Sequence, residues 1–304
     1  MTSSGTALPP STADARGAAG GVGMAFVLVW CTGYIAGTLA VAHGGPLTTL
    51  VLRFGLTTLV FALLALVGRA SWPARRELGH SAVVGALLLA LQFGGMYIGL
   101  RLGATAGVAA LATGSMPLVV ALLALAGGER LGGGQWSGLA IGFCGVAMVV
   151  ADRVDGATPP LAWLALGASV LGISLGTLYQ KRHASRLDMR VGLTVQNATA
   201  TLLVLPLAIV LEGVHFERSA AFLLPLAWLV GVNSVGGFAL LFVLIRRGAA
   251  TKVAALFFLM PPVTAVMGWL WLGEHLTLLK GAGFACAAAG VWLATRRAAP
   301  PGRA

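Results

Sequence analysis

Two prolines and two glutamates recur at one spacing in the two halves of the chain. Glu129 follows Pro117 by twelve residues, and Glu274 follows Pro262 by the same twelve. A proline within a helix removes a backbone hydrogen bond and bends the helix, so Pro117 and Pro262 can act as hinges or as packing kinks. Each glutamate can work as a gate or proton carrier, or as a surface carboxylate that caps a helix N-terminus.

One arginine, Arg53, falls well inside a long apolar run. If that run lies in a membrane, the charge costs about 3 kcal/mol or more, and its side chain must face other helices or reach towards the surface. Arg53 can then contact an anion near one membrane face, or bond backbone carbonyls of a neighbouring helix. We expect a structural role for Arg53, and likewise for Glu129 and Glu274.

Uncharged polar and aromatic residues also occur within the apolar runs. Each of them alone can be an interhelical hydrogen bond or an interface aromatic. Taken together they predict a pathway for a neutral, zwitterionic or hydrophobic small molecule. No histidine lies at the depth of these residues and no metal-ligand spacing occurs, so we expect no catalytic residue, metal or cofactor. The pathway candidates are Trp30, Tyr34, Gln92, Met96, Tyr97, Ser115, Ser169, Ser174, Asn233, Ser234, Phe257 and Phe258.

The composition predicts an all-α polytopic membrane protein, with the lipid bilayer as its main surroundings. Of the 304 residues, 58% are hydrophobic and only 10% are charged, and the mean hydropathy is +0.91. A soluble protein carries about 25% charged residues. The formal charge of +11 would suggest a nucleic-acid partner in a soluble protein. Here the cationic residues lie in short loops between apolar runs, so we expect no nucleic acid.

Ten apolar runs have about the length needed to cross a bilayer as helices. Cytoplasmic loops are enriched in Lys and Arg. With the N-terminus inside, fifteen of the 20 cationic residues fall on the cytoplasmic side, four fall outside and one lies in a span. This bias predicts an even number of spans with both termini in the cytoplasm. The predicted spans are 22–41, 46–67, 81–100, 104–126, 135–151, 161–180, 190–211, 223–245, 250–272 and 279–296.

The chain contains an internal duplication. The stretch from Arg101 to Val149 matches the stretch from Arg246 to Ala294 at a constant shift of 145 positions, without a gap. Such a long period indicates duplicated halves. Because each half holds five spans, an odd number, the second half enters the membrane inverted. Inverted repeats predict a central cavity that opens to either side in turn. The expected segments are a disordered cytoplasmic tail 1–20, a first repeat 21–151, an outer linker 152–160, a second repeat 161–297 and a cytoplasmic tail 298–304.

These features resemble the drug/metabolite transporter superfamily, in the form with two tandem EamA-type domains. Trp30 in the first span and Arg53-Phe54 in the second carry the resemblance, with Ala109-Ala110-Leu111 through Pro117 and then Gly128-Glu129-Arg130-Leu131. The second half repeats Ala254-Ala255-Leu256, Pro262 and Gly273-Glu274-His275-Leu276. The resemblance implies ten helices around a cavity and alternating access.

The resemblance also implies a function, namely export of small metabolites such as amino acids across a bacterial inner membrane. An alternative within transport is an efflux permease for drugs or toxic compounds. An intramembrane enzyme and a sensor module fit the residues less well. The sequence leaves open the solute, the direction of flux, coupling to an ion gradient and whether the chain forms a homo-oligomer.

Overall fold

The computed structural model describes residues 12–126, 132–151, 158–184, 187–246, 256 and 259–295. Most of them are helical, and one β-bridge joins Gly44 to Phe216. The helices of the first half are α1 (Thr12–His43), α2 (Pro46–Val67), α3 (Arg75–Gly85), η1 (Ala86–Leu91), α4 (Gln92–Arg101), α5 (Ala106–Gly114), α6 (Met116–Ala126) and α7 (Gly133–Ala151). Those of the second half are α8 (Pro160–His183), α9 (Met189–Glu212), α10 (Ala220–Trp228), η2 (Leu229–Gly236), α11 (Gly237–Arg246), α13 (Met260–Leu272) and α14 (Leu278–Thr295).

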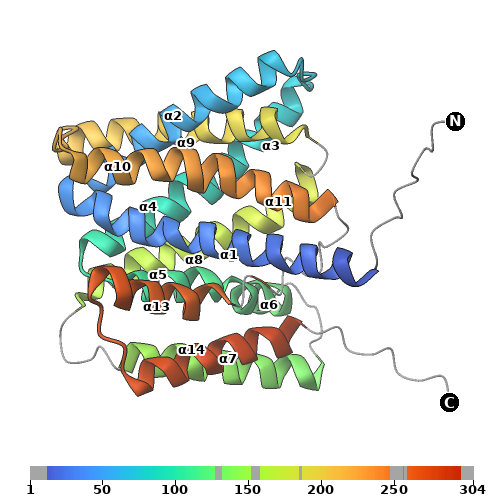
Figure 1. The fold of residues 1–304 in the computed structure, drawn as a ribbon, viewed down its shortest axis with the longest axis vertical. Coiled ribbons are helices and arrows are strands. Elements are labelled where there is room, and N and C mark those ends of the chain that lie inside the picture. The colour runs from blue at the N-terminus through green and yellow to red at the C-terminus, as the bar shows by residue number, and fades with distance from the viewer. Residues whose placement is uncertain are drawn as a thin grey trace, which may run out of the picture.

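The helices follow the predicted spans closely and run roughly side by side through the molecule (Figure 1). Within the described residues, seven helical stretches are long and apolar enough to cross a membrane, and α14 contributes a shorter apolar one. The protein is therefore a polytopic membrane protein. The predicted ninth span, 250–272, is described continuously only from residue 259, as the end that contains α13.

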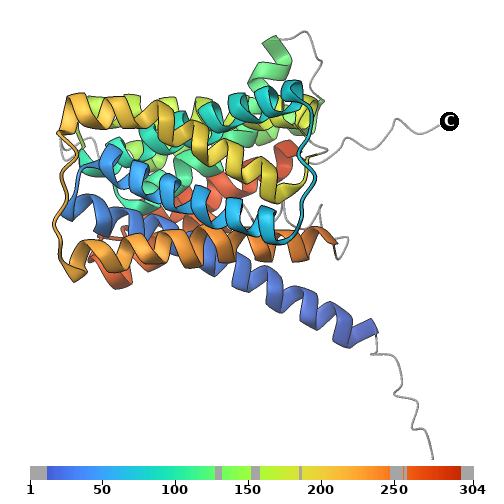
Figure 2. The same cartoon turned by 90° about the horizontal axis from the view of Figure 1, so that it is seen from above.

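Two helix starts differ from the prediction. Helix α1 begins at Thr12, so the last nine residues of the tail that composition predicts to be disordered are helical. The third span begins at Arg75 and not at 81. Hydropathy locates the edge of the lipid, whereas a helix can continue past that edge into water. The projecting end of α1 is visible in Figure 2.

The third span of each half is interrupted by a π-helical segment. Segment η1 joins α3 to α4, and η2 joins α10 to α11. The duplication shift of 145 carries 86–91 onto 231–236, which lies within η2. A π-helical turn is rare and is found mostly where function requires it. Both halves therefore carry the same local irregularity at the same place.

Equivalent helices of the two halves pack against each other in antiparallel pairs. In the pair α7 and α14, a Cβ added at Gly145 would lie 2.6 Å from the Gly283 carbonyl oxygen, and one at Gly290 would lie 2.7 Å from that of Gly138. These four glycines are two of the duplicated pairs, Gly138/Gly283 and Gly145/Gly290. Without side chains they let the two backbones touch. The close pairing is visible at the bottom of Figure 1.

The equivalent helices α2 and α9 are antiparallel as well, and so are α5 and α13, although the 145-residue shift makes α13 the counterpart of α6. Gly107 on α5 lies against Ala265 on α13, and Gly114 lies against Pro261. Helix α2 touches the end of α9 near its own start, through Glu212, and the beginning of α9 near its own end, where Arg190 donates to the Gly68 carbonyl oxygen.

The first helix of each half packs mainly against the other half. Helix α1 contacts α10, η2, α11 and α13, whereas α8 contacts α3, η1, α4, α5 and α6. Small residues allow this approach, because a Cβ at Gly95 would strike the Ala165 carbonyl on α8. The two halves are thus interleaved, and among the described residues the main apolar core contains side chains of both halves.

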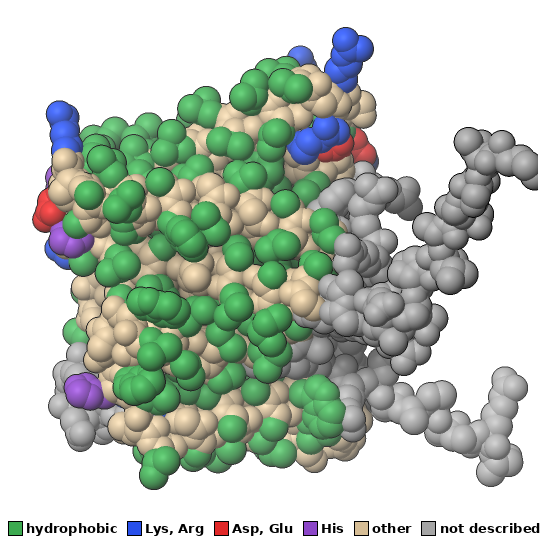
Figure 3. All heavy atoms as spheres, viewed as in Figure 1, with side chains coloured by type: hydrophobic (Ala, Val, Ile, Leu, Met, Phe, Trp, Pro, Cys, Tyr) green, Lys and Arg blue, Asp and Glu red, His purple; other side chains and the backbone are tan. Residues whose placement is uncertain are grey.

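Apolar side chains cover the middle of the face shown in Figure 3, and the charged groups lie near the two ends of the helices. The exposed large apolar residues include Leu59, Leu164, Leu202 and Val210. An apolar belt between two charged rims is the surface that a bilayer requires.

Candidate functional site

A buried polar cluster is built around Arg53 on α2. Its Nη1 donates to the Tyr97 hydroxyl at 3.0 Å, and its Nη2 donates to Asn233 Oδ1 at 2.8 Å. The Nε and Nη2 groups both lie 3.4 Å from Ser234 Oγ. Arg53 is only 4% exposed. The guanidinium therefore joins α2 and α4 of the first half to η2 of the second.

An aromatic wall covers one face of this guanidinium. The Phe93 ring centroid lies 4.7 Å from Arg53 Cζ, which is a cation–π contact. Phe93 in turn meets Phe54 and Tyr97 edge-to-face, at 6.0 and 6.3 Å between centroids. Phe54 and Tyr97 thus support the ring that lies against the guanidinium.

Asn233 ties the cluster to α1. Its Nδ2 donates to the Val29 carbonyl oxygen at 3.0 Å and to that of Trp30 at 3.3 Å. The Asn233 side chain fits because Gly33 faces it, and a Cβ there would lie 2.5 Å from Nδ2. Trp30 itself packs against Phe26 and Phe238. One amide side chain thus contacts both the arginine and the α1 backbone.

Arg53 has only neutral partners in the part of the chain that the structure describes. The ion pairs found there are His43 with Glu217 and Arg190 with Asp188, both near helix ends. A buried cation without a counter-ion is expensive even when it is hydrogen-bonded. The sequence offered two interpretations of Arg53, an anion contact or bonds to backbone carbonyls. The observed acceptors are side-chain oxygens.

The other pathway candidates fall into separate groups. Tyr34 and Met96 are buried in the apolar core with Tyr97. Gln92 lies at the start of α4, beside Gly172 of α8. Ser169 and Ser174 of α8 are fully buried, and neither hydroxyl has a hydrogen-bond partner. Phe257 and Phe258 lie outside the described residues.

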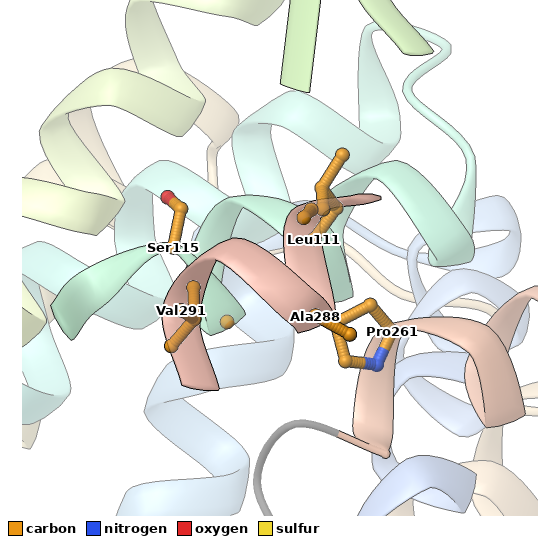
Figure 4. Close-up of a pocket in the computed structure, with 7 residues that line it drawn as sticks. Leu111, Ser115, Pro261, Ala288 and Val291 are labelled. Carbon is orange, nitrogen blue, oxygen red and sulfur yellow. The ribbon is translucent and has the colours of Figure 1, made fainter. Parts of the chain in front are cut away.

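A small hollow lies where α5 meets α13 and α14 (Figure 4). Its volume is about 10 Å³, which is room for about one water molecule. Leu111, Ser115, Pro261, Ala288 and Val291 line it. Ser115 separates α5 from α6, and its hydroxyl turns back to the Ala112 carbonyl oxygen at 2.7 Å. The sequence-predicted Ser115 therefore faces a packing gap and not the Arg53 cluster.

Helices α6 and α13 both begin next to the prolines that the sequence suggested as hinges or packing kinks. Helix α6 begins at Met116, with Pro117 in its first turn, and α13 begins at Met260, with Pro262 in its first turn. Residues 115 and 260 correspond under the 145-residue shift. A proline is tolerated in a first turn because the missing N–H has no partner there in any case.

Two carboxylates of the second half cap helices of the first half. Glu274 Oε1 accepts from the Ala106 N–H of α5 at 2.6 Å. Glu212 accepts from the N–H groups of Leu47 and Thr48 at the start of α2, each at 2.8 Å. Such contacts satisfy unpaired N–H groups and place negative charge at the positive end of a helix dipole. Glu129 lies outside the described residues.

At the opposite end of α9, Asp188 accepts one hydrogen bond from the backbone N–H of Arg190 and two from its side chain. Hydrogen bonding from the Arg190 side chain is the main cause that lowers the pKa of the Asp188 carboxyl below its ordinary value. This carboxylate precedes the helix and faces water.

Phe93 and Glu212 were missed at the level of sequence. Phe93 has a counterpart at the duplication shift, Phe238, so the repeat register contained a signal for it. Glu212 ends an apolar run, and nothing local indicates which distant helix it reaches. The fold brings the sequence-predicted residues Arg53, Tyr97, Asn233 and Ser234 into direct contact, and Asn233 also contacts the Trp30 carbonyl oxygen.

The sequence matches the EamA-like transporter family over residues 19–151 and again over 160–296. The chain belongs to the EamA-like transporter family. This EamA-like protein is 24% identical over 278 residues to a "Probable amino-acid metabolite efflux pump" of Escherichia coli (strain K12), covering 88% of this chain and 91% of the relative. It is 28% identical over 263 residues to the "Uncharacterized transporter YvbV" of Bacillus subtilis (strain 168), covering 84% and 85%.

A third relative is the "Uncharacterized inner membrane transporter YedA" of Escherichia coli (strain K12), at 24% identity over 257 residues, covering 84% of this chain and 83% of the relative. Among solved structures, one crystal structure matches 92% of the EamA-like chain and 98% of its own chain, with a TM-score of 0.61 and 21% identity. That match shows a shared fold.

Proposed function

We propose that this EamA-like protein exports small metabolites, amino acids or related neutral, zwitterionic or hydrophobic solutes, across a bacterial inner membrane by alternating access. The observation that carries the proposal is the antiparallel pairing of helices that the duplication makes equivalent, α2 with α9 and α7 with α14. Helices that are equivalent by duplication and antiparallel in space are the signature of inverted repeats.

In a pair of inverted repeats, each half can adopt the conformation of the other, and this exchange relates two conformations of the whole protein. If one is closed at the end where α2 and α5 begin, the other is closed at the opposite end. The interleaving of α1 and α8 supports this motion, because each could follow either half. Ten spans, with both termini in the cytoplasm, complete the proposed topology, and the excess of cationic residues in the proposed cytoplasmic loops supports it.

The class of solute rests on the cluster and on one relative. Amide, hydroxyl and aromatic groups surround a single cation, which suits a small polar solute better than a polyanion. The relative from Escherichia coli named for amino-acid metabolite efflux supports the same class. Efflux of drugs or toxic compounds is the second candidate, and the Phe54, Phe93 and Tyr97 rings favour it.

The function is tested by metabolite profiling of cells with and without the gene, inside the cell and in the medium. Export predicts at least one solute that falls inside and rises outside when the protein is produced. A solute that accumulates inside instead would contradict export and indicate uptake.

The topology is tested with single cysteines placed in turns 127–131 and 273–277, in a variant whose Cys31, Cys144 and Cys286 are replaced. A membrane-impermeant thiol reagent applied to intact cells should label the second turn and not the first. Labelling of both turns, or of neither, would contradict the inverted arrangement.

A further inference from the structure

We propose that Arg53 is the binding site for the carboxylate of the transported solute, so that the protein selects acids over their amides. This inference rests on the proposed function and narrows it to one chemical group. The motivating observation is a buried guanidinium whose described partners are all neutral.

The geometry of the guanidinium fits a carboxylate. Arg presents N–H groups in a planar fork that matches the two oxygens of a carboxylate. Nη2 donates to Asn233 Oδ1 at 2.8 Å, and the acceptor that Nε and Nη2 share along their common edge is Ser234 Oγ, at 3.4 Å from each nitrogen. Both distances to Ser234 Oγ are long for hydrogen bonds, so this edge is weakly occupied. A carboxylate placed there would make two shorter, charge-assisted bonds.

A second polar atom lies nearby on the same helix. Thr57 is four residues after Arg53, which puts it on the same face of α2, one turn along. Its side chain is fully buried, and its hydroxyl has no hydrogen-bond partner. A buried hydroxyl without a partner is uncommon. It provides a donor for a solute that is already held by Arg53.

Charge fixes the class of ligand. One cation with neutral surroundings balances a single negative charge, which is that of a carboxylate and not of a phosphate dianion. In a low dielectric, the attraction between a bound carboxylate and the Arg53 guanidinium offsets part of the free-energy cost of burying the cation. The Phe93 ring covers one face of the guanidinium, so the solute does not approach from that face.

Binding of a solute at Arg53 would also change the contacts that join the two halves, and would so affect their relative movement. Asn233 and Ser234 belong to η2 of the second half, whereas Arg53, Phe93 and Tyr97 belong to the first. A carboxylate that replaces Ser234 as the partner of Nε and Nη2 would remove a contact between the halves. The alternative role, in which Arg53 only fastens α2 to η2, predicts stability effects without selection among solutes.

The test uses the purified full-length protein and two readouts. The first is the thermal unfolding midpoint in detergent, titrated with each proteinogenic amino acid and with its carboxamide. The second is counterflow of the same compounds in proteoliposomes. We expect at least one acid to raise the midpoint while its amide does not. In Arg53→Gln that acid should bind about ten- to hundredfold more weakly, as expected for loss of a charge-assisted bond.

Two further variants keep the test decisive if Arg53→Gln does not fold. Ser234→Asp would place an internal carboxylate against the Nε–Nη2 edge, so we expect a stably folded protein that binds the acid at least about tenfold more weakly. Arg101→Gln is the matched control, because this exposed arginine donates to the Val41 carbonyl oxygen at a helix end. It should retain the selection for acids.

Three results would overturn the proposal: equal binding of acid and amide, undiminished acid binding in both Arg53→Gln and Ser234→Asp, or binding of no acid in the panel. Counterflow separates this failure from failure of the proposed function. Transport of amides as fast as acids would leave a transporter without the carboxylate site. Absence of any export in cells and of counterflow in liposomes would contradict both the proposed transport function and the carboxylate site.

Discussion

The glycine contact between α7 and α14 makes a prediction in which one substitution has opposite effects at two positions of the same helix. Gly290 and Gly281 both lie on α14. A Cβ at Gly290 would strike the backbone of Gly142, whereas one at Gly281 would meet nothing within 4 Å. Replacing each glycine by alanine therefore adds the same methyl group to a tight contact or to open space.

The expected magnitudes follow from two opposing terms. Alanine favours a helix over glycine by about 1 kcal/mol at an interior position. Overpacking costs about 1–3 kcal/mol or more, and the upper end applies at Gly290 because the opposing atoms are backbone. We therefore expect Gly290→Ala to destabilise by about 2 kcal/mol net, and Gly281→Ala to stabilise by up to about 1 kcal/mol.

The assay is the thermal unfolding midpoint of each purified variant in the same detergent. The midpoint of Gly290→Ala should fall by a few degrees, and that of Gly281→Ala should stay level or rise. The reciprocal contact supplies a second pair, Gly145→Ala against Gly134→Ala on α7, because a Cβ at Gly134 also meets nothing. Equal midpoints for Gly290→Ala and Gly281→Ala would refute the close antiparallel packing of α7 and α14.

Three further predictions concern carboxylates at the helix ends. Glu212→Ala leaves the first N–H groups of α2 without their acceptor and should lower the unfolding midpoint by an amount equivalent to about 1–2 kcal/mol. Glu274→Ala should lower the midpoint similarly, because it removes the acceptor at the start of α5. Glu217→Ala is the control, since it removes only an exposed contact to His43 and should change the midpoint little. Similar decreases in the midpoint for all three variants would contradict the capping role. For Asp188, the folded pKa lies below its ordinary value of 3.8. The stabilisation from the Asp188 carboxylate is therefore complete above about pH 4 and is lost as the pH falls through the lowered pKa. Asp188→Asn should make the unfolding midpoint less dependent on pH below about pH 4. The same decrease of the midpoint with acid in Asp188→Asn and in the unaltered protein would argue against this contribution.

Much of the architecture was accessible from hydropathy and from the duplication. The apolar runs located the helices, because a chain in lipid must pair its backbone groups within each span. The shift of 145 positions pairs Gly138 with Gly283 and Gly145 with Gly290. The structure shows why both halves have glycine there, because these residues form the Gly145–Gly283 and Gly138–Gly290 contacts. Periodicity could not show that α7 and α14 meet, because pairing between halves depends on tertiary packing.

The Arg53 cluster could be predicted only in part. Hydropathy marked Arg53 as a charge in an apolar run, and polarity marked Tyr97, Asn233 and Ser234. Their meeting depends on η2, since a π-helical turn rotates the following side chains relative to an α-helix. Asn233 is 180 positions from Arg53, so no local pattern could pair them. For Glu274, the sequence suggested a cap on a helix N-terminus but not which helix, and the structure gives α5, 168 positions away.

The matched π-helical segments bear on the history of the chain. Segment η1, carried forward by the duplication shift, falls within η2. A π turn corresponds to one residue more than the α-helix needs, and the simplest origin for such an irregularity in both halves is a single insertion in a shorter ancestor. That ancestor would have had five helices and could have bound its own antiparallel copy along the surfaces now used by α2 with α9 and α7 with α14. Fusion then freed the copies to diverge, and Arg53, whose counterpart at the same shift is Ala198, belongs to one half alone.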